Sequence, residues 1–487
     1  MREINLAAGA RCYQGQMMKV DELVIGGGPG GTPAAMALAS AGRQVLLVEK
    51  GAGLGGTCLF EGCIPSKILR ESAHRLQDVS RAQEFGVRVP AGELGVDWAA
   101  IMKRKAAILS GRADGALQRA RQIPGLNVQF GSAALLGARQ ARITPRDGTP
   151  EDVEFRNAII ATGSVPNFPP IPGVDLPQVL TSEQSLEIDR VPGRLVVIGG
   201  GPIGVEMAQI FAAFGSRVTL IEAGPRILAP VDEEIALALQ GHIRRQGVVL
   251  ELDAQIAAIV RDKDVVSVRY GTSGGASRQT QAEFVLEATG RRPNVEGLGL
   301  ERTRVRHDHR GVKVDGTLQT DEPGIYAVGD VVGHPMFAHW ASAQAFALAA
   351  HLTGRSARFP APAVNTAVIF STPEVGIAGL TESEARAAGH EVGVVRYDYR
   401  GDARAQVAGH AEGMLKIVYD HSNRAVLGVH VLAENAGSLL GEGALAVGAA
   451  IPVDALAAAI HPHPTLSESI GTAAREAIAA RRHGQGR

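Results

Sequence analysis

Residues 22–31 read ELVIGGGPGG and residues 45–49 read VLLVE, and these two runs set the fold of the N-terminal part of the chain. The apolar residues predict two buried strands, the glycines predict a tight turn, and the Ala-rich segment up to Gly42 predicts a helix between them. A strand, glycine turn, helix and strand in this order are typical of a dinucleotide-binding unit, in which the backbone approaches a pyrophosphate and a terminal carboxylate binds ribose hydroxyls. The candidate nucleotide-binding residues are Gly26, Gly28, Gly31 and Glu49.

The same pattern occurs a second time in residues 195–204 (LVVIGGGPIG) and 218–222 (VTLIE). Every landmark of the first unit is displaced by the same interval along the chain, which a chance match does not explain. We therefore expect two equivalent nucleotide-binding folds. The corresponding candidates in the second unit are Gly199, Gly201, Gly204 and Glu222.

Each unit also ends in the same way. Residues 158–163 (AIIATG) and 285–290 (VLEATG) are apolar strands that run into a turn of small residues, and these turns add Gly163 and Gly290 to the candidates. The proline-rich residues 165–173 are typical of a linker between the two units.

A later strand carries another candidate. Residues 324–330 read GIYAVGD and place Asp330 just past a buried strand, at the mouth of a parallel sheet where ligands bind. Taken alone, Gly329 and Asp330 also fit a plain turn.

Residues 55–67 read GGTCLFEGCIPSK and hold Cys58 and Cys63 five positions apart. With only three cysteines in the chain, this pair does not belong to a disulfide scaffold. Pro65 suits the first turn of a helix, which would leave Cys63 at a helix N-terminus, where the dipole favours a thiolate. The pattern predicts a thiol pair that opens and closes, and two inert buried cysteines are the alternative.

The composition limits the class of protein. At 487 residues the chain is long enough for about three domains. A formal net charge of -1 gives no electrostatic basis for binding nucleic acid or an anionic membrane, and no apolar run approaches the length of a membrane span. The scarcity of cysteine favours a reducing cytoplasm, and no metal site is predicted.

The C-terminal part has a different pattern from about residue 360 onward. Valine and isoleucine alternate with polar residues in 391–395 and 416–419, and two Ala-rich helices are expected around 437–447 and 472–481. This composition fits an α+β domain suited to self-association.

The cysteine stretch, the doubled glycine pattern, Asp330 and residues 461–468 (HPHPTLSE) follow one another in a single order. In this order they resemble the flavin-dependent pyridine nucleotide-disulfide oxidoreductases, most closely the dihydrolipoamide dehydrogenases, over nearly the whole chain from about Val20. The resemblance implies FAD and NAD as cofactors and a homodimer with shared active sites. It also implies a lipoyl-bearing protein, or the core of a 2-oxoacid dehydrogenase complex, as a partner.

The fold class implied is α/β, with two Rossmann-like, doubly wound, three-layer nucleotide-binding domains and a C-terminal α+β dimerisation domain. The expected segments are an N-terminal tail (1–18), an FAD-binding domain with the redox disulfide (19–165), an NAD-binding domain (166–293), the second part of the FAD-binding domain (294–360) and the dimerisation domain (361–487).

By this resemblance, the first glycine turn would hold FAD, with Glu49 on the adenosine ribose, Asp330 on the ribitol chain and Lys67 beside the flavin. The second turn would hold the nicotinamide nucleotide, and Glu222 would repel a 2′-phosphate, which favours NAD over NADP. The FAD set is Gly26, Gly28, Gly31, Glu49, Lys67, Gly163, Asp330 and Ala338, and the NAD set is Gly199, Gly201, Gly204, Glu222 and Gly290.

The resemblance also assigns catalytic roles. Cys58 is the interchange thiol that meets substrate, Cys63 is the thiolate that faces the flavin, and Lys67 is expected to pair with Glu206, because a buried lysine without a carboxylate is costly. His463 is the base, reaching across a two-fold axis into the partner's site, and the His463–Pro464 bond is a candidate cis peptide.

Glu468 has two competing uses. Its spacing from Thr465 fits a capping box for the following helix, whereas the family uses this glutamate to orient the imidazole of His463. We favour the family role over the capping box, on the reasoning that one carboxylate does not serve both geometries well. The neighbouring His461 is expected to be structural.

Two places depart from the family pattern. Phe60 and Glu61 stand where relatives usually have Asn-Val, and Trp340 stands where relatives commonly have lysine. These changes leave open another disulfide substrate, a diaphorase or quinone reductase with incidental cysteines, or a mainly architectural subunit. Mercuric reductase is disfavoured by a C-terminus without a cysteine pair, and glutathione-type reductases by Glu222.

Overall fold

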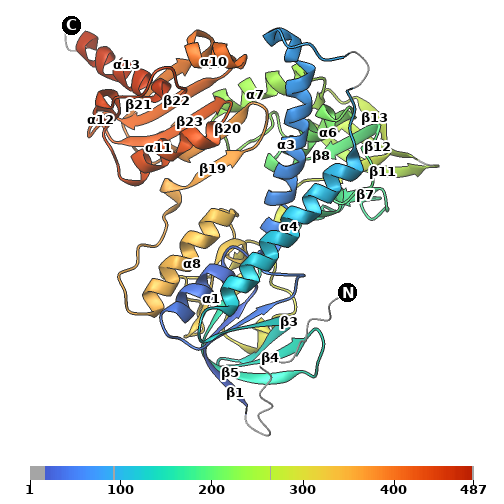
Figure 1. Ribbon diagram of the computed structural model, residues 1–487, viewed down its shortest axis with the longest axis vertical. Helices are drawn as coiled ribbons and strands as arrows, with labels where there is room; N and C mark the ends of the chain where they lie inside the picture. The colour runs from blue at the N-terminus through green and yellow to red at the C-terminus, as the bar shows by residue number, and fades with distance from the viewer. Residues whose placement is uncertain (1–16, 91–93, 264, 485–487) are drawn as a thin grey trace. The chain divides into compact units, whose positions relative to one another are not determined.

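The computed structural model describes residues 17–90, 94–263 and 265–484, and the chain divides into two compact units. The first unit comprises residues up to 56 with 113–164 and 293–359, and the second comprises 57–112, 165–292 and the residues from 360 onward (Figure 1). Most of the predicted tail, residues 1–16, lies outside the described residues. The predicted tail ends one residue too late, because Met18 already pairs with Val153 in the first strand.

The first unit contains a parallel sheet in the order β3-β2-β1-β5-β18, to which β4 adds antiparallel pairing between β3 and β5. Helices α1 and α8 pack against each other, and their apolar side chains share a core with one face of the sheet (Figure 1). The opposite face packs with Leu298, Leu300, Val305 and Val312. The elements are β1 (Met18–Ile25), α1 (Gly31–Ser40), β2 (Val45–Glu49), β3 (Leu126–Gly137), β4 (Gln140–Pro145), β5 (Glu151–Ile160), η2 (Leu300–Arg302), β16 (His307–Asp308), β17 (Gly311–Val312), β18 (Ile325–Ala327), η3 (Gly329–Val332) and α8 (Ala338–Leu352).

An acidic side chain of this sheet, Glu22, is completely buried. Glu22 on β1 is 0% exposed, its Oε1 accepts a hydrogen bond from Asn157 Nδ2 at 3.3 Å, and Arg43 Nε lies 4.0 Å away. Burial raises the pKa of the Glu22 carboxyl to about 7, because removal from water disfavours the charged form.

Glu22→Gln is expected to stabilise the protein above neutral pH. Below about pH 4.5 the glutamate is protonated in both the folded and the unfolded state. Between about 4.5 and 7 only the unfolded chain releases the proton, so the free energy of unfolding falls as the pH rises, by up to about 3 kcal/mol. Calorimetry should show a higher Tm for the variant at pH 8 and little difference at pH 4.5.

The matched control for this prediction is Glu154→Gln on the neighbouring strand. Glu154 forms a surface ion pair with Lys19 at 2.9 Å, and such pairs contribute about 0–1 kcal/mol. A Glu22→Gln protein that is no more stable than wild type at pH 8 would contradict the raised pKa of the buried Glu22 carboxyl.

The second unit begins with the cysteine segment and a second parallel sheet, in the order β10-β9-β8-β14-β7. Helix α3 packs on α6, and a three-stranded antiparallel sheet, β11-β12-β13, follows. The strand order around β8 matches that around β1, so both sheets have the doubly wound topology. The elements are α2 (Gly56–Phe60), α3 (Cys63–Ser80), η1 (Ala82–Phe85), β7 (Val179–Thr181), α5 (Ser182–Ser185), β8 (Arg194–Ile198), α6 (Pro202–Ala213), β9 (Arg217–Ile221), α7 (Glu233–Arg245), β10 (Val249–Glu251), β11 (Ala254–Asp262), β12 (Val265–Thr272), β13 (Ser277–Ala282) and β14 (Phe284–Glu287).

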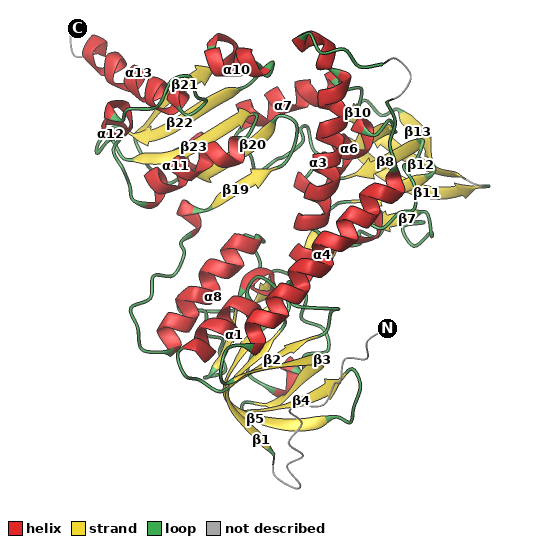
Figure 2. Cartoon of the chain, viewed as in Figure 1, coloured by secondary structure: helices red, strands yellow, loops and turns green. Residues whose placement is uncertain are grey.

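The C-terminal part of the second unit is an antiparallel sheet in the order β19-β20-β23-β22-β21. Helix α11 packs on β20 and β23, and α13 packs on β21 and β22 (Figure 2). The two predicted helices are confirmed, with α13 starting four residues earlier than expected. The elements are η4 (Pro362–Val364), β19 (Thr366–Ile369), β20 (Glu374–Gly379), α9 (Glu382–Ala387), β21 (Val392–Asp398), η5 (Tyr399–Gly401), α10 (Ala403–Ala408), β22 (Met414–Asp420), β23 (Val426–Ala433), α11 (Ala436–Gly448), α12 (Val453–Ala458) and α13 (Glu468–Gly484).

Three further elements contain the points where the chain passes between units, namely α4 (Trp98–Arg121), β6 (Ser164–Pro166) and β15 (Arg291–Pro293). Among the described residues, no helix is both long enough and apolar enough to cross a membrane.

Candidate active site

In the first unit, the glycine turn between β1 and α1 holds a carboxylate in a fixed position. Gly26 has a φ of +105°, and a Cβ on Gly31 would lie 1.7 Å from the carbonyl oxygen of Gly26, so the turn excludes side chains at both positions. Glu49 Oε2 accepts the N–H of Gly27 at 2.5 Å, and its Oε1 accepts the N–H of Gly51. A carboxylate has about four acceptor positions, so Glu49 retains capacity for ribose hydroxyls.

The second unit repeats this arrangement at equivalent positions. A Cβ on Gly204 would lie 1.9 Å from the Gly199 carbonyl oxygen. Glu222 Oε2 accepts the N–H of Gly200 at 2.6 Å, and its Oε1 accepts the N–H of Gly224 at 2.7 Å. The sequence repeat is therefore also a repeat of hydrogen bonds.

The helices that follow the two turns are suited to an anion. Neither α1 nor α6 has an acidic residue in its first turn, so nothing there competes with a bound pyrophosphate for the helix dipole. The space beside Gly201, Gly163 and Gly290 is open, with no heavy atom within 4 Å of a Cβ built there. Together with the two carboxylates, these features fit a dinucleotide in each unit.

Asp330 lies at the carboxyl edge of the first sheet. It follows β18, which pairs in parallel with β5, and Gly163 follows β5 at the same edge. Asp330 Oδ2 accepts a hydrogen bond from Ser164 Oγ at 2.7 Å. Ser164 was not predicted from the sequence. Its only sequence signal is that it directly follows Gly163, one of the predicted residues. Ala338 begins α8 in the same unit.

The cysteine pair lies at the start of α3, as predicted from Pro65. Cys58 belongs to α2, Cys63 is the first residue of α3, and both are free thiols. The pKa of Cys63 is lowered to about 7, first by its hydrogen bond with Cys58 and then by the charge of Lys67. The pKa of Cys58 is raised, because its thiol keeps the proton that it shares with Cys63 and because it is buried. The dithiol therefore holds its negative charge on Cys63.

Lys67 lies one turn along α3 from Cys63 and forms the predicted ion pair. Its Nζ is 2.7 Å from Glu206 Oε2 on α6, and it also lies 4.5 Å from the centre of the Phe370 ring. The other oxygen of Glu206 accepts the Phe370 N–H at 2.9 Å. Phe370 was missed because it follows Glu206 by 164 residues and carries no motif.

His463 and Glu468 are in contact, and the His463–Pro464 peptide is cis, as anticipated. His463 Nδ1 lies 3.0 Å from Glu468 Oε1 and 3.1 Å from its Oε2, and the His463 side chain is 73% exposed. The other ring nitrogen, Nε2, lies on the opposite side of the ring from this contact. His461 is partly buried against Glu442, with Nε2 3.0 Å from Oε1, which fits the structural role expected of it.

One expectation about Glu468 is wrong. Glu468 Oε2 also accepts the N–H of Thr465 at 2.9 Å, so the carboxylate makes the backbone bond of a capping box while it holds His463. Two oxygens with several acceptor positions make both bonds possible at once. These bonds, first to Thr465 and then to His463, lower the pKa of Glu468, which keeps it ionised at neutral pH.

Comparison with known families decides the classification. Residues 20–345 match the family model described as pyridine nucleotide-disulphide oxidoreductase, and residues 366–474 match the dimerisation domain of the same family. The chain belongs to the pyridine nucleotide-disulphide oxidoreductases. It is an NAD-dependent flavin oxidoreductase whose cofactors are FAD and NAD(H), and the second match supports a homodimer.

Several relatives of this family member carry the name dihydrolipoyl dehydrogenase. The protein of that name from Bacillus subtilis is 35% identical over 449 residues, covering 92% of this chain and 96% of the relative. Dihydrolipoyl dehydrogenase 3 from Pseudomonas aeruginosa is 36% identical over 468 residues, covering 94% and 98%.

Solved structures of similar fold include flavoprotein disulfide reductases. The Cu(II) complex of the HOCl-induced reductase RclA from Escherichia coli has a TM-score of 0.83 and 29% identity, covering 94% of this chain and 99% of that one. LpdA from Mycobacterium tuberculosis has a TM-score of 0.85 and 27% identity, with the same coverage.

The structure shows where the three residues that depart from the expected family pattern lie. Phe60 ends α2 between the cysteines, and Glu61 Oε2 lies 3.4 Å from the Thr57 hydroxyl that donates to it. Trp340 is buried in α8, so it fills space within the first unit. Phe60 and Glu61 thus lie between the two cysteines, and Trp340 lies in the first unit.

Proposed function

We propose that this oxidoreductase converts dihydrolipoamide to lipoamide with NAD⁺ as the electron acceptor. The observation that carries the proposal is the dithiol at the N-terminus of α3, in which Cys63 ionises near neutral pH and Cys58 keeps its proton. Relatives of similar length named dihydrolipoyl dehydrogenase support the substrate class. Reduction of another disulfide is the alternative, motivated by Phe60 and Glu61.

The domain assignment is part of the proposal. Segments 19–165 and 294–360 bind FAD, 166–293 bind NAD, and 361–487 form the dimer interface, each with the residues predicted from sequence. FAD, when bound, would supply two-electron redox chemistry between the dithiol and NAD⁺. Glu49 and Asp330 would hold the first cofactor, and Glu222, fixed by two backbone N–H groups, would receive the ribose of the second.

The thiol chemistry follows from the unequal pKa values of the two cysteines. In the oxidised enzyme a substrate thiolate attacks the sulfur of Cys58, and Cys63 leaves as a thiolate, because the thiol of lower pKa is the better leaving group. The second substrate thiol then attacks the substrate sulfur of the mixed disulfide. Its proton passes to the leaving Cys58 sulfur, and lipoamide is released. Two electrons have passed from the substrate to the dithiol.

His463 is proposed as the base that takes the proton from the attacking thiol. Glu468 holds Nδ1 and stabilises the imidazolium, so that Nε2 receives the proton. In the homodimer, we assign each His463 to the dithiol of the partner protomer, consistent with its exposure.

The experiment that tests the function compares disulfide and quinone substrates. The FAD-loaded protein is assayed for NADH oxidation with lipoamide, with glutathione disulfide and with a quinone, before and after alkylation of the reduced enzyme. We expect fast turnover with lipoamide, lost after alkylation, and poorer turnover with NADPH because of the Glu222 carboxylate. Turnover with quinone alone would contradict lipoamide as the substrate without contradicting the fold. Lipoamide turnover that persists after alkylation would contradict the role of the dithiol.

The setting of the reaction is also a proposal. A lipoyl-bearing protein, free or within a 2-oxoacid dehydrogenase core, would supply the substrate, and the scarcity of cysteine supports a reducing cytoplasm.

A further inference from the structure

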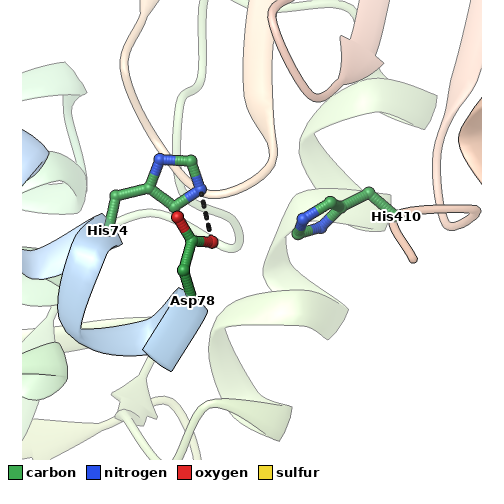
Figure 3. Close-up of side chains that lie close together, drawn as sticks. All are labelled: His74, Asp78 and His410. Atoms are coloured by element: carbon green, nitrogen blue, oxygen red, sulfur yellow. Dashed lines mark ion pairs between the residues drawn. The ribbon is translucent and has the colours of Figure 1, made fainter. Parts of the chain in front are cut away.

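Two histidines and two carboxylates meet in the second unit, away from the residues assigned to the reaction. His74 and Asp78 lie four residues apart on α3, which places them on one face of the helix. His410 follows α10, and Glu434 follows β23. Figure 3 shows the His410 ring facing His74 and Asp78 from a separate segment.

The nitrogen and oxygen atoms of this group converge on a small volume. The ligand atoms of His74, Asp78 and His410 all lie within 4.8 Å of one another. His74 Nε2 is 3.6 Å from Asp78 Oδ1, and Glu434 bridges the two rings, with 3.9 Å to His74 Nε2 and 3.0 Å to His410 Nε2. Four ligands of a tetrahedral ion with bonds of about 2.0–2.2 Å lie about 3.3 Å apart, so small side-chain rotations bring these atoms to that spacing.

We propose that His74, Asp78, His410 and Glu434 form a binding site for a divalent transition ion of the Zn²⁺ class. Two imidazoles with two carboxylates are a ligand set that such ions accept, whereas Mg²⁺ and Ca²⁺ take oxygen ligands. With four protein ligands the site is closed, which is the form of a structural rather than a catalytic ion. An ion here would fasten the C-terminal half of α3, the helix that begins at Cys63, to the segments that carry His410 and Glu434.

The charges around the group are compatible with an ion. Two arginines lie near the group. Arg81 is engaged by Glu84 at 2.8 Å and by the Gly409 carbonyl at 3.0 Å. Arg75 is engaged by Glu71 at 2.6 Å, and its Nη1 lies 3.8 Å from Asp78 Oδ2, the weaker of its two contacts. The two carboxylates balance the charge of a divalent ion.

Zinc titration of the oxidised, FAD-loaded homodimer by isothermal calorimetry tests the site. In the oxidised protein Cys58 and Cys63 are joined in a disulfide, which iodoacetamide does not modify. Treatment with iodoacetamide before the titration alkylates any other accessible thiol. Wild type is expected to bind one Zn²⁺ per protomer at neutral pH, and His74→Gln and His410→Gln are expected to weaken binding by at least about tenfold. Zinc should raise the Tm of wild type and not that of these variants.

The matched control is His242→Gln, which removes an imidazole that lies 3.3 Å from a single carboxylate, Glu412, in the same unit. It should bind zinc as wild type does. If either ligand variant loses FAD absorbance, Asp78→Asn on the exposed face of α3 replaces it in the comparison. No binding by wild type at sub-millimolar zinc, or equal binding by the ligand variants, would overturn the proposal. Because none of these residues takes part in thiol exchange, lipoamide turnover without zinc is expected to be unchanged in every variant.

Discussion

Cys58→Ser is expected to lower the rate of lipoamide-dependent NADH oxidation by at least about 1,000-fold, as removal of a reacting nucleophile does in other enzymes. A serine oxygen cannot form the disulfide that the substrate thiolate attacks, and no other described cysteine than Cys63 is available to replace it. The measurement is steady-state turnover of the FAD-loaded variant with lipoamide. Quinone turnover in the same preparation is the control for cofactor binding, because it does not require the disulfide. Lipoamide turnover at the wild-type rate would refute the mechanism.

Two substitutions of Cys58 distinguish between two causes of the low pKa of Cys63. The hydrogen bond from Cys58 is the largest cause and the charge of Lys67 is a smaller one. A serine hydroxyl still donates to Cys63, so in Cys58→Ser the alkylation rate of Cys63 should rise with pH around a midpoint near 7. In Cys58→Ala the donor is lost, and the midpoint should shift to higher pH. Identical pH profiles in the two variants would show that the hydrogen bond does not set this pKa.

The features that could be predicted from sequence are those that depend on neighbouring residues. The two glycine turns and their carboxylates follow from local backbone geometry. Gly31 lies against the backbone of Gly26, which is only five residues earlier, and Glu49, at the end of the next strand, accepts a hydrogen bond from the Gly27 N–H. The helix start at Cys63 follows from Pro65 in the same way.

The features that could not be predicted depend on segments distant in the chain. The bond from Phe370 N–H to Glu206 and the approach of His410 to His74 join segments with no shared motif. The failed expectation for Glu468 has a different cause. The expectation assumed that a carboxylate makes one interaction, whereas the two oxygens of Glu468 contact both Thr465 N–H and His463 Nδ1.

His463→Gln is expected to lower the rate of dihydrolipoamide oxidation by about 10²–10⁴-fold, the usual contribution of a general base. Glu468→Gln should cost less, because an amide oxygen can still accept from Thr465 N–H and from Nδ1–H, and only the negative charge is lost. The measurement is kcat with dihydrolipoamide and NAD⁺, and quinone turnover should be unchanged in both variants, since it needs no thiol deprotonation. Equal losses in the two variants would show that the charge of Glu468, rather than the imidazole, dominates.

A mixed dimer then decides which protomer each His463 serves. One protomer carries Cys58→Ser and the other carries His463→Gln, each with a different affinity tag, so that the heterodimer can be isolated from the two inactive homodimers. If His463 acts on the dithiol of its partner, the heterodimer contains one intact pairing of Cys58 with His463 and should show about half of the wild-type turnover. If His463 acts within its own protomer, neither site is complete and the heterodimer should be as inactive as its parents. Recovery of activity therefore requires that the dimer, and not the single chain, is the catalytic unit.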